Sequence, residues 1–112
     1  MIKMNPKQAE AVPFVRGEIA KGGEMFYSAP AGVGKMLVLA EAVRGIPRVA
    51  FVSRHMELVA QFKAQCDAFA EPITNIDFVH ARTGLIGHYE VVIACESMKE
   101  VKINHPIVIR CE

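Results

Sequence analysis

The sequence lacks the features that mark membrane, secreted or strongly nucleic-acid-binding proteins. No apolar run approaches the roughly 20 residues of a membrane-spanning helix, and residues 1–6 lack the apolar core of a signal peptide. The formal net charge is only +1 over 112 residues, so there is little electrostatic attraction to nucleic acid or to membranes. We therefore expect a cytoplasmic protein that does not bind membranes.

Cysteine is also scarce, at three residues without C-x-x-C spacing: Cys66, Cys95 and Cys111. An odd number without paired spacing argues against a disulfide framework and against a zinc site. The four histidines show no metal-like spacing either, so the sequence predicts no metal site. We expect reduced thiols.

The residues that are present suffice for one folded domain over residues 1–112. Hydrophobic residues make up 52% of the chain, which favours a packed core over disorder. The sequence shows no repeat, low-complexity stretch or linker, and its length is typical of a single domain.

Strand and helix patterns alternate along the chain. A first helix is predicted from Asn5–Pro6, an N-cap followed by proline, to about Lys21, where two glycines end it. Ser53 is placed to cap a later helix. The apolar stripes of the second and third helices are Met36, Leu39, Ala40, Val43 and Leu58, Phe62, Cys66, Phe69. We assign three phenylalanines at helical core spacing to packing: Phe14, Phe62 and Phe69.

Five short apolar runs predict strands at residues 24–28, 48–53, 73–79, 89–94 and 106–109. The runs are continuous rather than alternating, which is typical of parallel strands covered by helices on both faces. We therefore predict an α/β protein, a three-layer sandwich with a mostly parallel sheet of about five strands. Its ligand is expected beyond the carboxyl ends of the strands.

Between the first strand and the second helix lies an octapeptide that fits a phosphate-binding loop, G-x-x-x-x-G-K-[ST], except at its first and last positions. Glycines allow the backbone conformations that aim several N–H groups at a phosphate, and the lysine reaches the β- and γ-phosphates. The N-terminus of the following helix adds partial positive charge. The candidate phosphate-binding residues are Ala29, Pro30, Ala31, Gly32, Val33, Gly34, Lys35 and Met36.

Met36 occupies the position that normally offers a hydroxyl to Mg²⁺. A thioether is a poor ligand for a hard cation. We therefore expect the loop to bind phosphate, with ATP as the candidate ligand, and to bind Mg²⁺ poorly.

Several segments resemble the first RecA-like domain of superfamily-two helicases, the DEAD/DEAH-box type, from near residue 5 onward. Gln8 matches the glutamine of the Q motif, which recognises adenine in that family. Residues 29–35 are similar to motif I, and residues 54–61 resemble motif Ia. The resemblance implies a P-loop NTPase with a RecA-like fold.

Two departures from the family pattern affect the expected activity. His55 and Met56 replace a threonine and an arginine of motif Ia, which contacts the nucleic-acid backbone in the family, so nucleic-acid binding has little support. The sequence also stops before the family's second RecA-like domain, which supplies an arginine finger. We do not expect these residues to unwind nucleic acid on their own.

Motif II, an apolar strand followed by Asp-Glu, has two candidate remnants. One is Cys111–Glu112 and the other is Cys95–Glu96, and we prefer the first because motif II normally lies farther from the phosphate loop. In both, cysteine replaces the aspartate that helps to hold Mg²⁺. Glu112 and Glu96 are the candidate catalytic residues because the family's glutamate positions the attacking water. The alternative for each is an exposed carboxylate at a strand end.

Two hypotheses follow for function. The first is a non-catalytic, helicase-like module that keeps the phosphate-binding loop and docks on a partner protein; a decoy or inhibitor encoded by a phage or mobile element is one version. The second is an ATPase half of a helicase, completed by a second RecA-like domain. We favour the first because both metal-ligand positions are changed. We also expect a partner or self-association surface at a sheet edge near the fifth strand.

Overall fold

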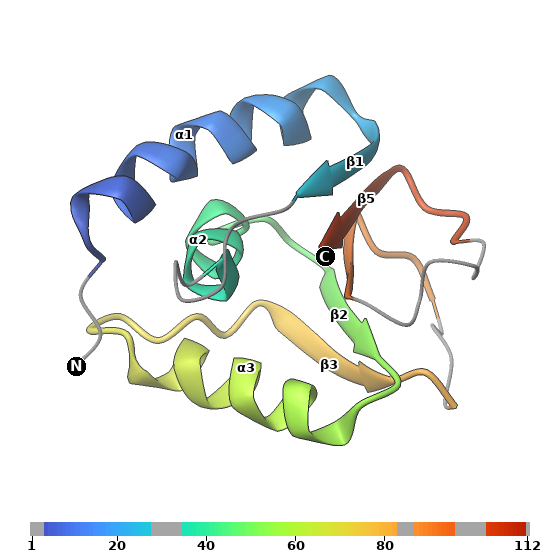
Figure 1. Cartoon of the computed structure of the whole chain (residues 1–112). Coiled ribbons are helices and arrows are strands. Elements are labelled where there is room, and N and C mark those ends of the chain that lie inside the picture. Colours follow the sequence, from blue (N-terminus) through green and yellow to red (C-terminus); the bar gives the residue numbers. More distant parts are fainter. Residues whose placement is uncertain (1–3, 28–34, 83–86, 96–102, 112) are drawn as a thin grey trace.

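The computed structural model describes residues 4–27, 35–82, 87–95 and 103–111. Three helices and five strands are described, in the order shown in Figure 1. Their bounds are α1 Pro6–Lys21, β1 Gly23–Tyr27, α2 Lys35–Ala42, β2 Val49–Ser53, α3 Met56–Ala68, β3 Ile76–His80, β4 Val91–Cys95 and β5 Ile107–Cys111. None of these helices is long and apolar enough to cross a bilayer.

Helix α1 begins and ends where its local sequence predicts. The Asn5 side chain accepts a hydrogen bond from the Gln8 N–H at 2.8 Å, and Gln8 Oε1 accepts one from the Asn5 N–H at 2.9 Å. This reciprocal capping box satisfies two N–H groups that the helix leaves without partners. Gly22 ends the helix at a positive φ of 76°, a conformation that glycine adopts without strain.

The five strands form one sheet in the order β1-β5-β4-β2-β3, and every neighbouring pair is parallel. The prediction of an α/β fold with about five parallel strands is therefore confirmed. The third strand starts at Ile76 rather than at residue 73. The N–H of Ile73 instead bonds to the Cys66 carbonyl of α3, and its side chain is buried in the core.

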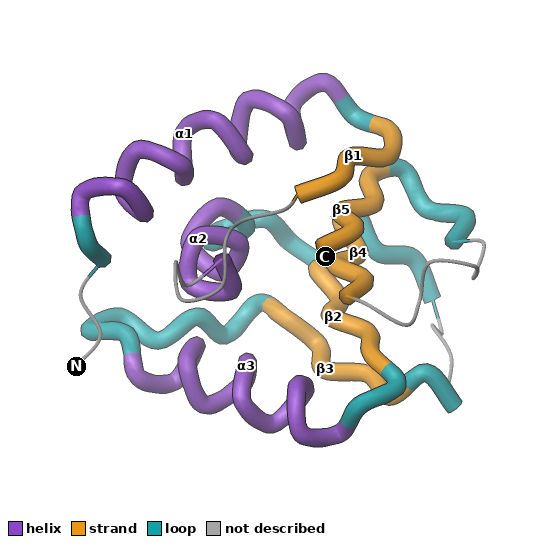
Figure 2. The backbone as a smooth tube through the Cα atoms, in the orientation of Figure 1, coloured by secondary structure: helices purple, strands orange, loops and turns teal. Residues whose placement is uncertain are grey.

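All three described helices lie on one face of the sheet, as Figure 2 shows. No described helix covers the other face, so the second helical layer of the predicted three-layer sandwich stays a prediction. The connections from β1 to β2 and from β2 to β3 run in one direction across the sheet, and those to β4 and β5 return. Crossover connections between parallel strands are right-handed, so connections that run in opposite directions across a sheet lie on opposite faces. The connections from β3 to β4 and from β4 to β5 therefore belong on the face without helices, and their described parts are not helical.

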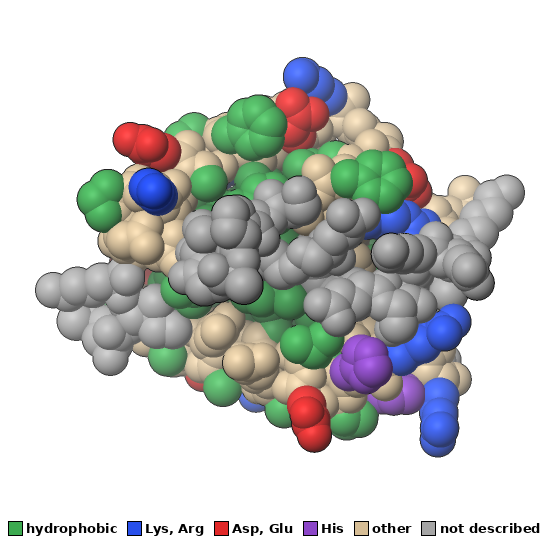
Figure 3. All heavy atoms as spheres, viewed as in Figure 1, with side chains coloured by type: hydrophobic (Ala, Val, Ile, Leu, Met, Phe, Trp, Pro, Cys, Tyr) green, Lys and Arg blue, Asp and Glu red, His purple; other side chains and the backbone are tan. Residues whose placement is uncertain are grey.

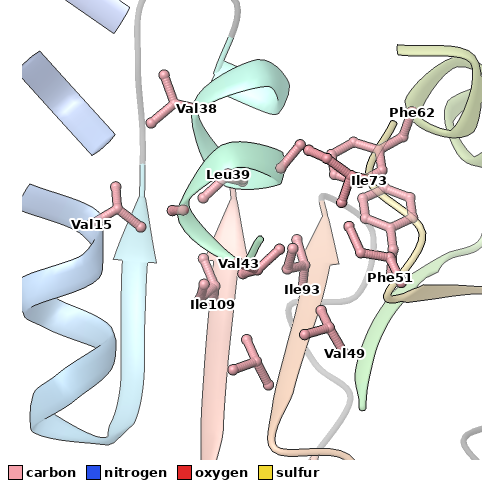
Figure 4. Close-up of a cluster of buried hydrophobic side chains, with 14 of the residues drawn as sticks. Val15, Val38, Leu39, Val43, Val49, Phe51, Phe62, Ile73, Ile93 and Ile109 are labelled. Atoms are coloured by element: carbon pink, nitrogen blue, oxygen red, sulfur yellow. The ribbon is translucent and has the colours of Figure 1, made fainter. Parts of the chain in front are cut away.

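The main core lies between the helices and the sheet. In Figure 4, Leu39 of α2 and Val43, the residue after the end of α2, lie over Ile109 and Ile93. Phe51 and the Phe62 ring of α3 stack beside them with centroids 4.5 Å apart. On the opposite face, a smaller cluster of buried residues comprises Ala50, Val52, Val92 and Ala94.

One assignment to the core is wrong. Phe14 is 63% exposed, because it lies on the side of α1 away from its buried residues Val12, Val15 and Ile19. Phe62 is buried as predicted, and Phe69 packs partly against the core. Helical spacing alone does not reveal which of two apolar stripes faces the sheet.

The position of the fifth strand differs from expectation. β5 lies between β1 and β4, so the edges of the described sheet are β1 and β3. β5 is paired on both sides and so is not itself an edge, and a docking surface near it stays a prediction.

Candidate phosphate-binding site

The predicted phosphate-binding loop joins β1 to α2. Residues 28–34, and with them Ala29 to Gly34 of the candidate site, lie outside the described residues, as does the side chain of Lys35. β1 ends at Tyr27 and α2 begins at Lys35, so the segment links the carboxyl end of a parallel strand to the N-terminus of a helix. This is the strand–loop–helix order that a phosphate-binding loop requires.

Both flanks of the loop are anchored in the core. Tyr27 is buried at the end of β1, and burial raises the pKa of its hydroxyl above the ordinary value of 10.0. Val38 and Leu39 are fully buried one turn into α2. The positions at which the loop leaves the sheet and enters the helix are therefore held by packing rather than by the loop itself.

Met36 contributes to that packing. Its side chain is half-buried and lies against the main core. A methionine at this position adds apolar contact to the start of α2, and it brings no oxygen for a hard cation.

The pairing of β1 with β5 bears on the two candidate remnants of motif II. Tyr27 lies in register with Cys111, and Cys111 lies in register with Cys95. The backbone of Cys111 therefore neighbours the strand that leads into the loop, whereas Cys95 is one strand farther away. Glu112 and Glu96 lie outside the described residues, as do the side chains of both cysteines.

Gln8 is buried rather than solvated, and its Oε1 is held by the capping box of α1. The side chain therefore has a structural role in the start of α1. Recognition of adenine by Gln8 stays a prediction.

Sequence reasoning missed an ion pair next to the loop strand. Arg110 Nε of β5 donates to Glu24 Oε2 of β1 at 3.0 Å, and the arginine is largely buried. The available signal was one charged residue at an end of each of two apolar runs, Glu24 at the start of one and Arg110 directly after the other. A buried charge calls for a partner, but the sequence does not reveal that these two strands are neighbours.

The segment that resembles motif Ia lies where β2 passes into α3. It lines an open hollow of about 560 Å³ formed by Arg54, His55, Met56, Glu57, Leu58 and Gln61. The predicted capping of this helix by Ser53 is wrong, because the N-cap position is His55. The Ser53 hydroxyl is buried and accepts the His55 N–H at 3.1 Å.

His80 connects the ends of β2 and β3. Its Nδ1 accepts the backbone N–H of Arg82 at 3.0 Å, so this nitrogen carries no proton. Nε2 therefore carries the proton and donates to the Arg54 carbonyl at 3.1 Å. Histidine and basic side chains gather in this part of the surface, near the arrowheads of β2 and β3 (Figure 3).

No protein-family model matches this chain, and no curated protein is significantly similar to it. Its functional interpretation therefore depends on the loop pattern and on the described geometry around it. Within the described ranges, no group of three or more His, Cys, Asp or Glu residues is placed to hold a metal ion.

Proposed function

We propose that this chain is a P-loop module similar to the first RecA-like domain of superfamily-two helicases, which holds nucleotide without hydrolysing it and acts by docking on a partner protein. The observation that carries this proposal is the octapeptide of residues 29–36 between β1 and α2. An all-parallel sheet with the loop at its carboxyl edge supports the same fold class.

We expect no hydrolysis because two positions that would bind Mg²⁺ carry other side chains. Met36 stands where a hydroxyl would bind Mg²⁺, and Cys111 stands where an aspartate would. Phosphoryl transfer depends on a metal ion to neutralise charge that develops in the transition state. Cys111 lies in register with Tyr27 and Cys95 lies in register with Cys111, so both candidate positions are at the carboxyl ends of their strands and the choice of Cys111 rests on the sequence pattern.

The test is ATP binding by calorimetry, with and without Mg²⁺, for the wild type and for Lys35→Ala. The matched control is Lys63→Ala, because Lys63 is an exposed lysine on α3 that pairs with Asp67. We expect binding that is lost in Lys35→Ala, kept in Lys63→Ala and unchanged by Mg²⁺. Absence of ATP binding to the wild type would refute the nucleotide part of the proposal.

The second candidate function is an ATPase half of a nucleic-acid helicase. One observation favours it. The residues that resemble motif Ia line a hollow at the carboxyl end of β2, and the predicted loop follows the carboxyl end of β1, so both lie at the side of the sheet where the parallel strands end. ATP binding that Mg²⁺ strengthens would support this function over the first. A double variant, Met36→Thr with Cys111→Asp, would then release phosphate from ATP in the presence of Mg²⁺.

A further inference from the structure

β1 has one backbone side that is paired and one that is open. Gly23 N–H donates to the Pro106 carbonyl at 3.0 Å, and Gly23 lies in register with Ile107 of β5. In a parallel ladder the residues that bond to one neighbour alternate with those that face the other side. The backbone N–H and C=O groups of Gly23, and of every second residue after it in β1, therefore face β5. The backbone N–H and C=O groups of Glu24 and Phe26 face away from the sheet.

No described residue pairs with that outward side. β1 is the outermost strand at one end of the sheet, and no backbone or side-chain hydrogen bond from the described ranges reaches the outward groups of Glu24 or Phe26. An edge of this kind is a template for an added strand.

The opposite edge, β3, is better protected. By the same alternation its outward backbone belongs to Ile76, Phe78 and His80, whose side chains are buried or half-buried on the helix side. β3 exposes no large hydrophobic side chain, whereas Phe26 of β1 is exposed, and the Asp77 carboxylate of β3 already accepts a hydrogen bond from the Tyr89 hydroxyl at 3.0 Å. β1 is therefore the edge more open to pairing.

The side chains at the β1 edge define the chemistry of an added strand. Phe26 is 66% exposed, and Glu24 lies on the same face two residues away. The Glu24 carboxylate is half-exposed although it accepts the Arg110 hydrogen bond. Cross-strand pairs are favourable between apolar or aromatic residues and between opposite charges.

From this geometry we infer that β1 is the docking edge for an extended segment of a partner protein, which adds a strand to the sheet. The segment carries an apolar side chain beside Phe26 and a lysine or arginine beside Glu24. This inference rests on the docking part of the proposed function and is independent of nucleotide binding.

A second copy of this chain fits the edge less well. Two-fold pairing of β1 with itself is antiparallel: centred on Met25 it sets Glu24 opposite Phe26, and centred on Phe26 it sets the two Phe26 rings opposite each other. Neither register places a cation opposite Glu24. A partner peptide with alternating apolar and basic residues matches both side chains.

A displayed library of random peptides, selected on the labelled wild-type chain, tests this inference. We expect enriched peptides to share an alternating apolar and basic pattern. Phe26→Pro removes the outward N–H without removing a donor to β5, and it should weaken binding about tenfold. The matched control Phe26→Leu keeps both the N–H and an apolar side chain, and it should bind within about twofold of the wild type.

A second measurement does not depend on how well Phe26→Pro folds. A synthetic copy of an enriched peptide should slow amide hydrogen exchange at Glu24 and Phe26 of the wild type. Enriched peptides that leave both amides unprotected, a library without enrichment, or self-association through β1 would each overturn the inference. Lys35→Ala should bind the peptides normally, so a failure of nucleotide binding is distinguishable from a failure of this edge.

Discussion

Arg110 Nε donates to Glu24 Oε2 at 3.0 Å and joins β5 to β1 across 86 positions of sequence. The arginine side chain is 11% exposed and the glutamate side chain 45% exposed. Both lie on the sheet face opposite the helices, because their neighbours Ile109 and Met25 face the main core. The pair therefore helps to hold together the strand that leads into the predicted loop and the strand that ends beside it.

The first prediction concerns the strength of this pair. In a double-mutant cycle with Glu24→Gln and Arg110→Met, we expect a coupling free energy of about 1–2 kcal/mol, because the arginine is largely withdrawn from water. The measurement is the free energy of unfolding in urea.

The matched control is the ion pair of Lys63 with Asp67 on α3, where N and O are 3.3 Å apart and both side chains are exposed. Its cycle, with Lys63→Met and Asp67→Asn, should give about 0.5 kcal/mol or less. Equal coupling in the two cycles would contradict the first prediction.

Much of the fold was predictable because its signals are local. The capping residue Asn5, the glycine at position 22 and the apolar runs mark where elements begin and end. Strand order was not predictable, because it depends on contacts between residues far apart in sequence. The location of β5 between β1 and β4 is the clearest example.

The candidate site was likewise predictable only where its signal is contiguous in the sequence. The octapeptide was visible because its pattern is contiguous, whereas the pairing of Glu24 with Arg110 required knowledge of which strands are neighbours. Phe14 and Phe62 show a related limit: both fit a helical stripe, and only the packing of α1 and α3 separates them.

The second prediction compares the buried Phe62 with the exposed Phe14. Phe62 stacks on Phe51 and also meets Phe78 with ring centroids 5.8 Å apart. Phe62→Ala should therefore lower the free energy of unfolding by about 3–5 kcal/mol, through lost burial and a cavity. Phe14→Ala should change it by no more than about 0.5 kcal/mol, because Phe14 is exposed. Thermal or urea unfolding followed by circular dichroism would measure both, and a comparable loss in Phe14→Ala would contradict this assignment.

The third prediction concerns Asn75, whose side-chain amide binds the turn that follows α2. Nδ2 donates to the Val43 carbonyl at 2.8 Å and to the Ile46 carbonyl at 2.7 Å. Asn75→Ala removes both bonds and should lower the free energy of unfolding by about 2 kcal/mol. Asn75→Asp should be more destabilising, since a carboxylate would face two carbonyl oxygens.

Asn104 provides the control for this experiment, because it is exposed in the loop before β5. Asn104→Ala and Asn104→Asp should each change the free energy of unfolding by about 0.5 kcal/mol or less. If Asn75→Asp proved as stable as the wild type, the donor role of the Asn75 amide would be ruled out.

The last prediction is a pH dependence set by Cys66. Burial, followed by the charge of Asp67, raises the pKa of its thiol from 9.0 to about 11. Because the folded state holds this proton more tightly than the unfolded state, the resulting stabilisation is fully present below pH 9.0. It is lost as the pH rises through about 11.

Cys66→Ala isolates this effect, because other groups that titrate in alkaline solution are common to both proteins. The wild type should be more stable than Cys66→Ala at neutral pH, by about 1 kcal/mol for the lost buried sulfur. Between pH 9.0 and about 11 that difference should shrink, since only the wild type must hold a buried thiol against deprotonation. Urea unfolding of both proteins across this range is the measurement. A difference that stays constant with pH would mean that the Cys66 thiol titrates alike in the folded and unfolded chain.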